Sequence, residues 1–169
     1  VEGTYDLTPS LSITLGGRYT LETRKFSQRI NGVQLFTDAE EDFDKFTYRA
    51  AIQYEVSPFL NIYATYGNGF KSRTFNTFSP SNVAVQPETI DAVEFGIKAD
   101  PLPWLRANLA TYFYNYDNLQ VTARAADNSF VLQNAASAEI YGGELELFVD
   151  PVTGLNLRAA LAYAHSEYV

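Results

Sequence analysis

The chain has 169 residues, a formal net charge of −8, and no cysteine or methionine. The absence of cysteine excludes a disulfide-built domain and a cysteine-ligated zinc site, and the acidic balance argues against a nucleic-acid partner, which usually meets a basic face. Hydrophobic residues make up 46% of the sequence. No run approaches the roughly 18 apolar residues that a membrane-spanning helix requires.

Apolar and polar residues alternate along eight segments, which predicts β-strands with one apolar and one polar face. In one of them, Leu11, Ile13 and Leu15 alternate with Ser12 and Thr14. Soluble strands average about five or six residues, whereas a strand that crosses a bilayer needs roughly 9 to 11, and most of these segments reach that length. We expect strands over about residues 2–6, 11–24, 45–56, 59–69, 88–99, 104–120 (the longest), 138–149 and from 155 to at least 163.

Short turns and long connections alternate between these segments. The short turns contain Thr8-Pro9, Ser57-Pro58, Asp100-Pro101 and Asp150-Pro151, and the long, polar connections cover residues 25–44, 71–87 and 121–137. Tight turns at one end and long loops at the other are typical of transmembrane β-barrels. A soluble sandwich whose polar face meets bulk water is the alternative, and strand length and loop asymmetry both argue against it.

Charged residues recur on the polar face of the expected strands, among them Arg49, Lys98 and Glu144. An Arg or Lys that faces lipid at the bilayer midplane costs about 2 to 4 kcal/mol, so we expect this face to line a wet or protein-filled lumen. Aromatic residues such as Phe59 and Trp104 lie beside the turns and others lie near the loops. Two belts of this kind are typical of the two membrane interfaces.

Three stretches resemble TonB-dependent outer-membrane receptors. They are a tyrosine-rich strand that ends in Gly-Phe-Lys (62–76), a Pro-Glu-Thr stretch followed by Glu-x-Gly-x-Lys (86–98), and a Gly-x-Glu-x-Glu strand (138–147). The resemblance implies an all-β fold, an antiparallel up-and-down meander of about eight strands that is part of a 22-stranded transmembrane barrel. We interpret residues 1–169 as a partial barrel domain from the C-terminal half, with the plug domain, the TonB box and the remaining strands outside this sequence.

The resemblance also implies a function in the bacterial outer membrane. The intact protein would import a ferric siderophore or similar bulky nutrient, energised by TonB, ExbB and ExbD through the plug, and it would contact outer-membrane lipid and lipopolysaccharide. It implies no cofactor and no enzyme activity. His165 is the only histidine and no Gly-x-Ser-x-Gly elbow is present, so we expect no catalytic residue. A passive porin-like barrel or small adhesin and an outer-membrane hydrolase remain alternatives.

Rings and cations gather where the strands meet the long connections. Cations would complement an anionic ferric siderophore, and rings would supply stacking area. Anchoring of lipopolysaccharide, or the simple ending of strands, would account for the same residues. We predict ligand contact for Phe70, Lys71, Arg73, Phe75, Arg24 and Lys25, with Arg29 and Phe78 beside them.

Five acidic residues crowd the first long connection: Asp38, Glu40, Glu41, Asp42 and Asp44. Carboxylate oxygens bind calcium, but the spacing is not that of an EF-hand loop. We expect a solvated acidic loop and no metal site. The alternative is a divalent ion that bridges these carboxylates to lipopolysaccharide phosphate.

Overall fold

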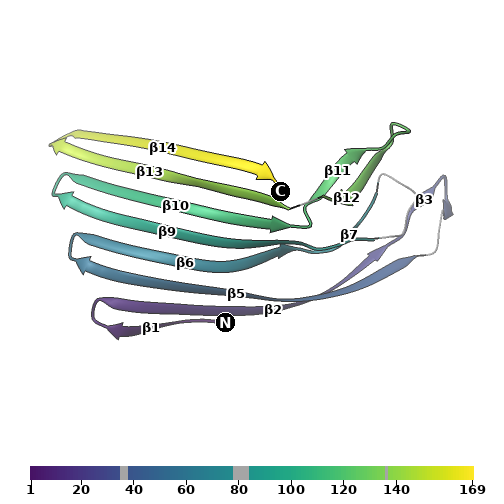
Figure 1. The fold of residues 1–169 in the computed structure, drawn as a ribbon, viewed down its shortest axis with the longest axis horizontal. Coiled ribbons are helices and arrows are strands. Elements are labelled where there is room, and N and C mark those ends of the chain that lie inside the picture. Colours follow the sequence, from purple (N-terminus) through teal and green to yellow (C-terminus); the bar gives the residue numbers. More distant parts are fainter. Residues whose placement is uncertain (35–37, 78–83, 136) are drawn as a thin grey trace.

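A single eight-stranded sheet dominates the computed structural model, which describes residues 1–34, 38–77, 84–135 and 137–169. Each strand pairs antiparallel with its neighbours in chain order (Figure 1), which confirms the expected all-β meander. The strands are β1 (Glu2–Thr8), β2 (Leu11–Phe26), β5 (Ala39–Ser57), β6 (Leu60–Lys71), β9 (Glu88–Leu102), β10 (Leu105–Asp117), β13 (Ala138–Val152) and β14 (Leu155–Tyr168).

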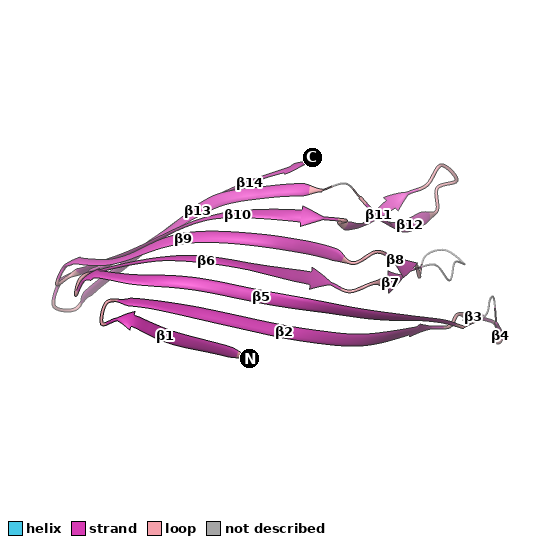
Figure 2. Cartoon of the chain, turned by 60° about the horizontal axis from the view of Figure 1, so that its bottom comes forward, coloured by secondary structure: helices cyan, strands magenta, loops and turns pink. Residues whose placement is uncertain are grey.

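Three small hairpins are built from the long connections. They are β3 (Arg29–Ile30) with β4 (Val33–Gln34), β7 (Thr74–Phe75) with β8 (Ala84–Val85), and β11 (Gln120–Arg124) with β12 (Phe130–Asn134). All three lie at the end of the sheet opposite the tight turns (Figures 1 and 2). This confirms the predicted asymmetry between a turn end and a loop end. Within the described ranges, we find no helix that is long and apolar enough to span a membrane.

Away from the loop end, the pairing register gives each face of the sheet a uniform character, because residues directly opposite one another share a face. One row across seven strands is apolar throughout: Leu11, Tyr54, Ile62, Ile97, Leu109, Leu145 and Leu161. The adjacent row, on the other face, is polar or small: Ser12, Gln53, Tyr63, Gly96, Ala110, Glu144 and Ala162. The alternation along each strand therefore becomes an alternation of whole faces.

The apolar face has no protein layer over it. Among the described apolar residues, only Phe75 and Ala138 are buried, whereas Leu15 and Leu161 are 62% and 70% exposed. Two-layer packing around a shared core, which a soluble domain requires, is therefore absent from the described residues. An apolar face of this size suits contact with hydrocarbon.

Two strands differ most in extent from the prediction. β5 begins at Ala39 rather than near residue 45, so it is the longest strand, and four of the five acidic residues lie on it instead of in a loop. Two of these four accept hydrogen bonds from β2: the Thr23 hydroxyl donates to Asp42 over 2.7 Å and the Tyr19 hydroxyl to Asp44 over 2.9 Å. These cross-strand contacts offset the low β-propensity of aspartate. β10 ends at Asp117, and Gln120 instead opens β11.

The positions of the tight turns also differ in detail from the prediction. Pro9 and Pro58 lie in two-residue turns, but Pro101 and Pro151 lie inside β9 and β13, and the turns follow them. The register shifts at both places. Proline suits such a bulge because it has no N–H for the ladder. Proline therefore marks the turn end correctly while its exact place varies.

Glycines give space to tyrosine rings on the polar face. A Cβ on Gly96 would lie 2.2 Å from the Tyr63 ring, and a Cβ on Gly142 would lie 2.6 Å from the Tyr112 hydroxyl and 2.2 Å from the Tyr163 carbonyl oxygen. In each cross-strand pair the ring covers the glycine directly opposite. This arrangement protects the bare backbone of a strand glycine.

We predict that Gly142→Ala destabilises the barrel much more than Gly143→Ala. The new methyl group at 142 meets a backbone atom of β14, so the strand pair must move, whereas at 143 the nearest atom, the Ala110 carbonyl oxygen, is 3.2 Å away. Thermal unfolding of the purified full-length protein in detergent measures the difference. Equal melting temperatures for the two variants would show that the close approach at Gly142 is not a constraint.

We predict that Leu109→Arg impairs barrel stability and Asn108→Arg does not. Leu109 lies in the apolar row and Asn108 on the opposite face. An arginine on the lipid face costs up to about 2 to 4 kcal/mol near the midplane. Urea unfolding of each full-length variant in lipid vesicles measures its free energy of unfolding. The assignment of the faces is wrong if Asn108→Arg is the more costly change.

Candidate functional site

The polar face of β5, β6 and β9 surrounds a hollow of about 750 Å³. The Tyr63 hydroxyl donates to Glu94 Oε1 over 2.7 Å, and Lys98 Nζ lies 5.5 Å from the centre of the Tyr63 ring. Arg49 and Gln53 complete one side of the hollow. The groups that line it form hydrogen bonds and ion pairs readily, so this face suits water or a polar protein surface rather than lipid.

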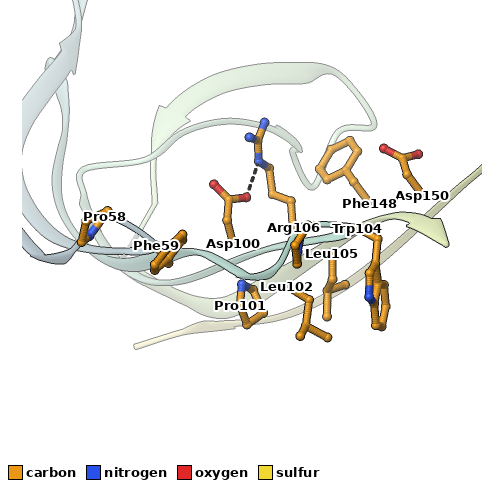
Figure 3. A pocket seen from close by; sticks show the side chains of 11 residues that line it. Pro58, Phe59, Asp100, Pro101, Leu102, Trp104, Leu105, Arg106, Phe148 and Asp150 are labelled. Carbon is orange, nitrogen blue, oxygen red and sulfur yellow. Dashed lines mark hydrogen bonds and ion pairs between the residues drawn. The ribbon is translucent and has the colours of Figure 1, made fainter.

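At the turn end, charged groups lie on one side of the sheet together with the Phe148 ring (Figure 3). Arg106 Nε donates to Asp100 Oδ1 over 2.7 Å, and both side chains lie on one side of the sheet. Leu102 and Trp104 point to the other side (Figure 3). The hollow there measures about 720 Å³. An aromatic residue beside apolar residues on the outer side agrees with the predicted interfacial belt.

Arg73 connects three segments of the chain at the loop end of the sheet. Its guanidinium donates to Glu41 Oε2 over 2.9 Å and to Gln86 Oε1 over 3.1 Å. Arg73 follows β6, Glu41 is on β5, and Gln86 precedes β9. Both partners of this ion pair are half-buried, so it is screened less than an exposed pair.

Aromatic rings support the same region. The Phe26 and Phe75 rings stack with centroids 5.1 Å apart and an interplanar angle of 11°. The Phe43 and Phe70 rings meet at 5.1 Å in a tilted arrangement. Phe75 is only 6% exposed, so in this arrangement it packs the base of the β7–β8 hairpin against β2.

Each of the four predicted cations lies near a carboxylate. Arg24 Nε donates to Glu22, Lys25 Nζ lies 3.1 Å from Glu40, and Lys71 Nζ lies 4.0 Å from Glu88; Arg73 pairs with Glu41, as described above. The positive charge at this end is therefore largely compensated.

The predicted residues fall into three groups. Arg73 bonds Glu41, which lies opposite Arg24 in the β2–β5 register, and Phe75 stacks on Phe26, two residues from Arg24 on the same face of β2. Phe70 and Lys71 lie beside them at the end of β6. Lys25 is on the opposite face, one residue from Arg24 in the same alternating strand. Arg29 lies in the β3–β4 hairpin, and Phe78 lies outside the described residues.

Sequence reasoning missed four members of this region: Glu22, Phe26, Glu41 and Phe43. The signal was present, because the alternation of β2 extends through Phe26 and that of β5 extends back to Ala39, which places all four on the polar face. We name the set of Glu22, Arg24, Phe26, Glu41, Phe43, Phe70, Arg73 and Phe75 the mouth cluster.

Within the described part of the chain, the acidic residues of the first connection do not converge as a group of three candidate ligands. Glu40, Asp42 and Asp44 alternate with Glu41 along β5, so they lie on the other face from it. Lys25, Thr23 and Tyr19 contact them in turn. Strand geometry thus spreads these carboxylates apart.

Comparison with known proteins agrees with these features. The family model described as TonB dependent receptor-like, beta-barrel matches residues 1–169. The chain belongs to the TonB-dependent receptor family. It is therefore a piece of an outer-membrane β-barrel wall.

Solved structures of TonB-dependent receptors share the fold. The ferric yersiniabactin uptake receptor FyuA from Yersinia pestis superposes with a TM-score of 0.81 at 17% identity over 99% of this chain and 26% of its own. The copper transporter OprC gives 0.80 at 17% over 99% and 28%. The alcaligin receptor FauA from Bordetella pertussis gives 0.69 at 21% over 98% and 29%. The chain thus spans a little over a quarter of these receptors.

We predict that Phe26→Ala uncovers Phe75. Loss of the stacked ring removes both buried area and an aromatic pair worth about 0.5 to 1.5 kcal/mol, so the β7–β8 hairpin loosens. Chymotrypsin treatment of cells that display the full-length receptor should then cut at Phe75 faster than in the wild type. Tyr5→Ala, on the distant and exposed β1, is the control. Unchanged cutting at Phe75 would contradict the packing role of Phe26.

Proposed function

We propose that this chain is part of an active transporter that imports a ferric siderophore or similar bulky nutrient across the outer membrane. Membership of the TonB-dependent receptor family supports the proposal most directly. Receptors for ferric yersiniabactin and alcaligin share the fold, and so does a copper transporter. The fold neighbours therefore carry different cargoes, and the name of one of them, the ferric yersiniabactin uptake receptor, states an iron chelate.

The rest of the parent protein supplies what these residues lack. We propose that residues 1–169 are a partial domain of a barrel of 22 strands, that a plug domain fills the lumen, and that TonB with ExbB and ExbD acts through that plug. The polar hollow lined by Arg49, Tyr63, Glu94 and Lys98 supports a hydrated protein surface as its partner. Lipopolysaccharide would cover the outer face, and no covalent chemistry is required.

The mouth cluster is the proposed point of ligand contact on this wall. Its cations are paired with carboxylates, so net charge contributes little, and ring stacking together with directed hydrogen bonds would supply recognition. Lys71, which ends β6 beside the mouth cluster, has its side chain 59% exposed, compared with 43% for Arg24 and 32% for Arg73. In the chain, Phe70 precedes Lys71 and Arg73 lies two residues after it.

We predict that replacing Lys71 and Arg73 with alanine weakens uptake of an anionic ferric chelate about tenfold while the barrel stays folded. Removal of the two cations leaves Glu88 and Glu41 without their partners, so the mouth repels an anion. Initial uptake rates of iron-59-labelled chelate by intact cells measure the effect. Arg124→Ala, on exposed β11, is the matched control. Unchanged uptake in the double variant would remove both residues from the site.

Deletion of the full gene tests the function itself. The deletion strain should fail to grow when one particular ferric siderophore is the only iron source, and the cloned gene should restore growth. A proton uncoupler should abolish uptake, because transport energised through TonB depends on the proton gradient. Uptake that persists with the uncoupler would favour a passive porin, and normal growth on every iron source would contradict the proposal.

A further inference from the structure

A side chain from one connection closes the base of another. Gln120 opens β11, and its Nε2 donates to the backbone carbonyl oxygens of Ser72, at 2.9 Å, and Gln86, at 3.0 Å. Ser72 directly follows β6, and Gln86 lies just before β9. We call the connection over residues 72–87 the second loop and that over 118–137 the third loop. Both hydrogens of one amide group thus hold the two ends of the second loop together.

Neighbouring contacts hold Gln120 in place. Its backbone N–H donates to Glu88 Oε2 over 2.9 Å. Asn134 lies opposite Gln120 in the β11–β12 hairpin, and its Nδ2 donates to the carbonyl oxygens of Gln86, at 3.0 Å, and Asn118, at 2.8 Å. The Gln86 N–H donates back to Asn134 Oδ1 over 2.7 Å. The base of the third loop is therefore bonded to the base of the second at several points.

The hydrogen bond from Gln120 to the Ser72 carbonyl oxygen is shielded from water. Gln120 is 9% exposed and Ser72 is 7% exposed. A buried hydrogen bond has no competing water, and its loss leaves a backbone carbonyl without a partner. The donors come from a neutral amide, and a glutamate in its place would present oxygen atoms to two carbonyl oxygens.

The closed base leads directly to the mouth cluster. Arg73 follows Ser72, and its guanidinium bonds Gln86 at the other end of the same loop as well as Glu41 on β5. Phe75 lies two residues further on, against Phe26. A change in the separation of Ser72 and Gln86 would therefore displace both the guanidinium and the ring.

We propose that Gln120 is a positioning residue for ligand binding: it closes the base of the second loop and so fixes the mouth cluster, and the bases of the second and third loops act as one unit. Gln120 itself does not contact the ligand. The inference rests on the proposed function, because it assumes that the mouth cluster binds the transported ligand.

Gln120→Leu in the full-length receptor tests this role, because leucine keeps most of the volume and removes both donors. Gln133→Leu, the same change at an exposed position of β12, is the control. Hydrogen exchange of the purified receptor reports on residues 72–77 and 84–88. We expect about tenfold faster exchange there in Gln120→Leu, unchanged exchange in the body of β6 and β9, and no change in Gln133→Leu.

Binding of ferric yersiniabactin and ferric alcaligin to intact cells supplies the second measurement. We expect Gln120→Leu to raise the Kd of whichever chelate binds about tenfold, and its melting temperature to stay near that of the wild type. Unchanged exchange in residues 72–77 and 84–88 overturns the proposal. So does faster exchange with an unchanged Kd, if the Lys71 and Arg73 double variant loses affinity.

A failure of the proposed function would give a different combination of binding and exchange results. In that case the double variant and Gln120→Leu both bind the chelate as the wild type does, although exchange in the second loop is faster. If neither chelate binds, the exchange measurement alone decides whether Gln120 fixes the second loop, and the growth screen decides the function.

Discussion

A sheet that meets two different surroundings must satisfy every backbone hydrogen bond within itself and must divide its side chains by face. Strand pairing on both edges meets the first requirement for the inner strands β2 to β13, since hydrocarbon offers the backbone no partner. Alternation meets the second, and the register turns it into continuous rows. Every other feature of the wall, from the glycine–tyrosine pairs to the turn-end bulges, fits within this constraint.

The same constraint explains which features sequence reasoning could find. Strand identity, pairing order and the two ends follow from a period of two and from the turns, so the eight strands were predicted correctly. Strand extent was predicted less well. Acidic residues such as Asp42 and Asp44 indicated a loop, but cross-strand hydroxyls from β2 hold them in β5. The local composition of a segment does not reveal a hydrogen-bond partner that lies about 20 residues away along the chain.

The candidate site was predictable only in part. Arg24, Arg73 and Phe75 were identified as types that suit ligand contact, and the structure brings them together. Glu22 and Glu41 compensate the charges of Arg24 and Arg73. This compensation depends on the register of two strands and on the path of the loop that carries Arg73, so no local pattern in the sequence shows it. Gln120 is a further case, because a single glutamine at the start of a short hairpin carries no signal until its two carbonyl partners lie beside it.

The central claim is that alternate residues of one strand meet hydrocarbon and a wet interior. Spin labels at single engineered cysteines along residues 107–112 of β10, in the full-length protein in lipid vesicles, test it most directly. The account predicts that odd positions are accessible to oxygen, which partitions into lipid, and even positions are not, with the opposite trend for a water-soluble nickel reagent. Equal accessibility at odd and even positions, or odd positions shielded from both reagents, would contradict it.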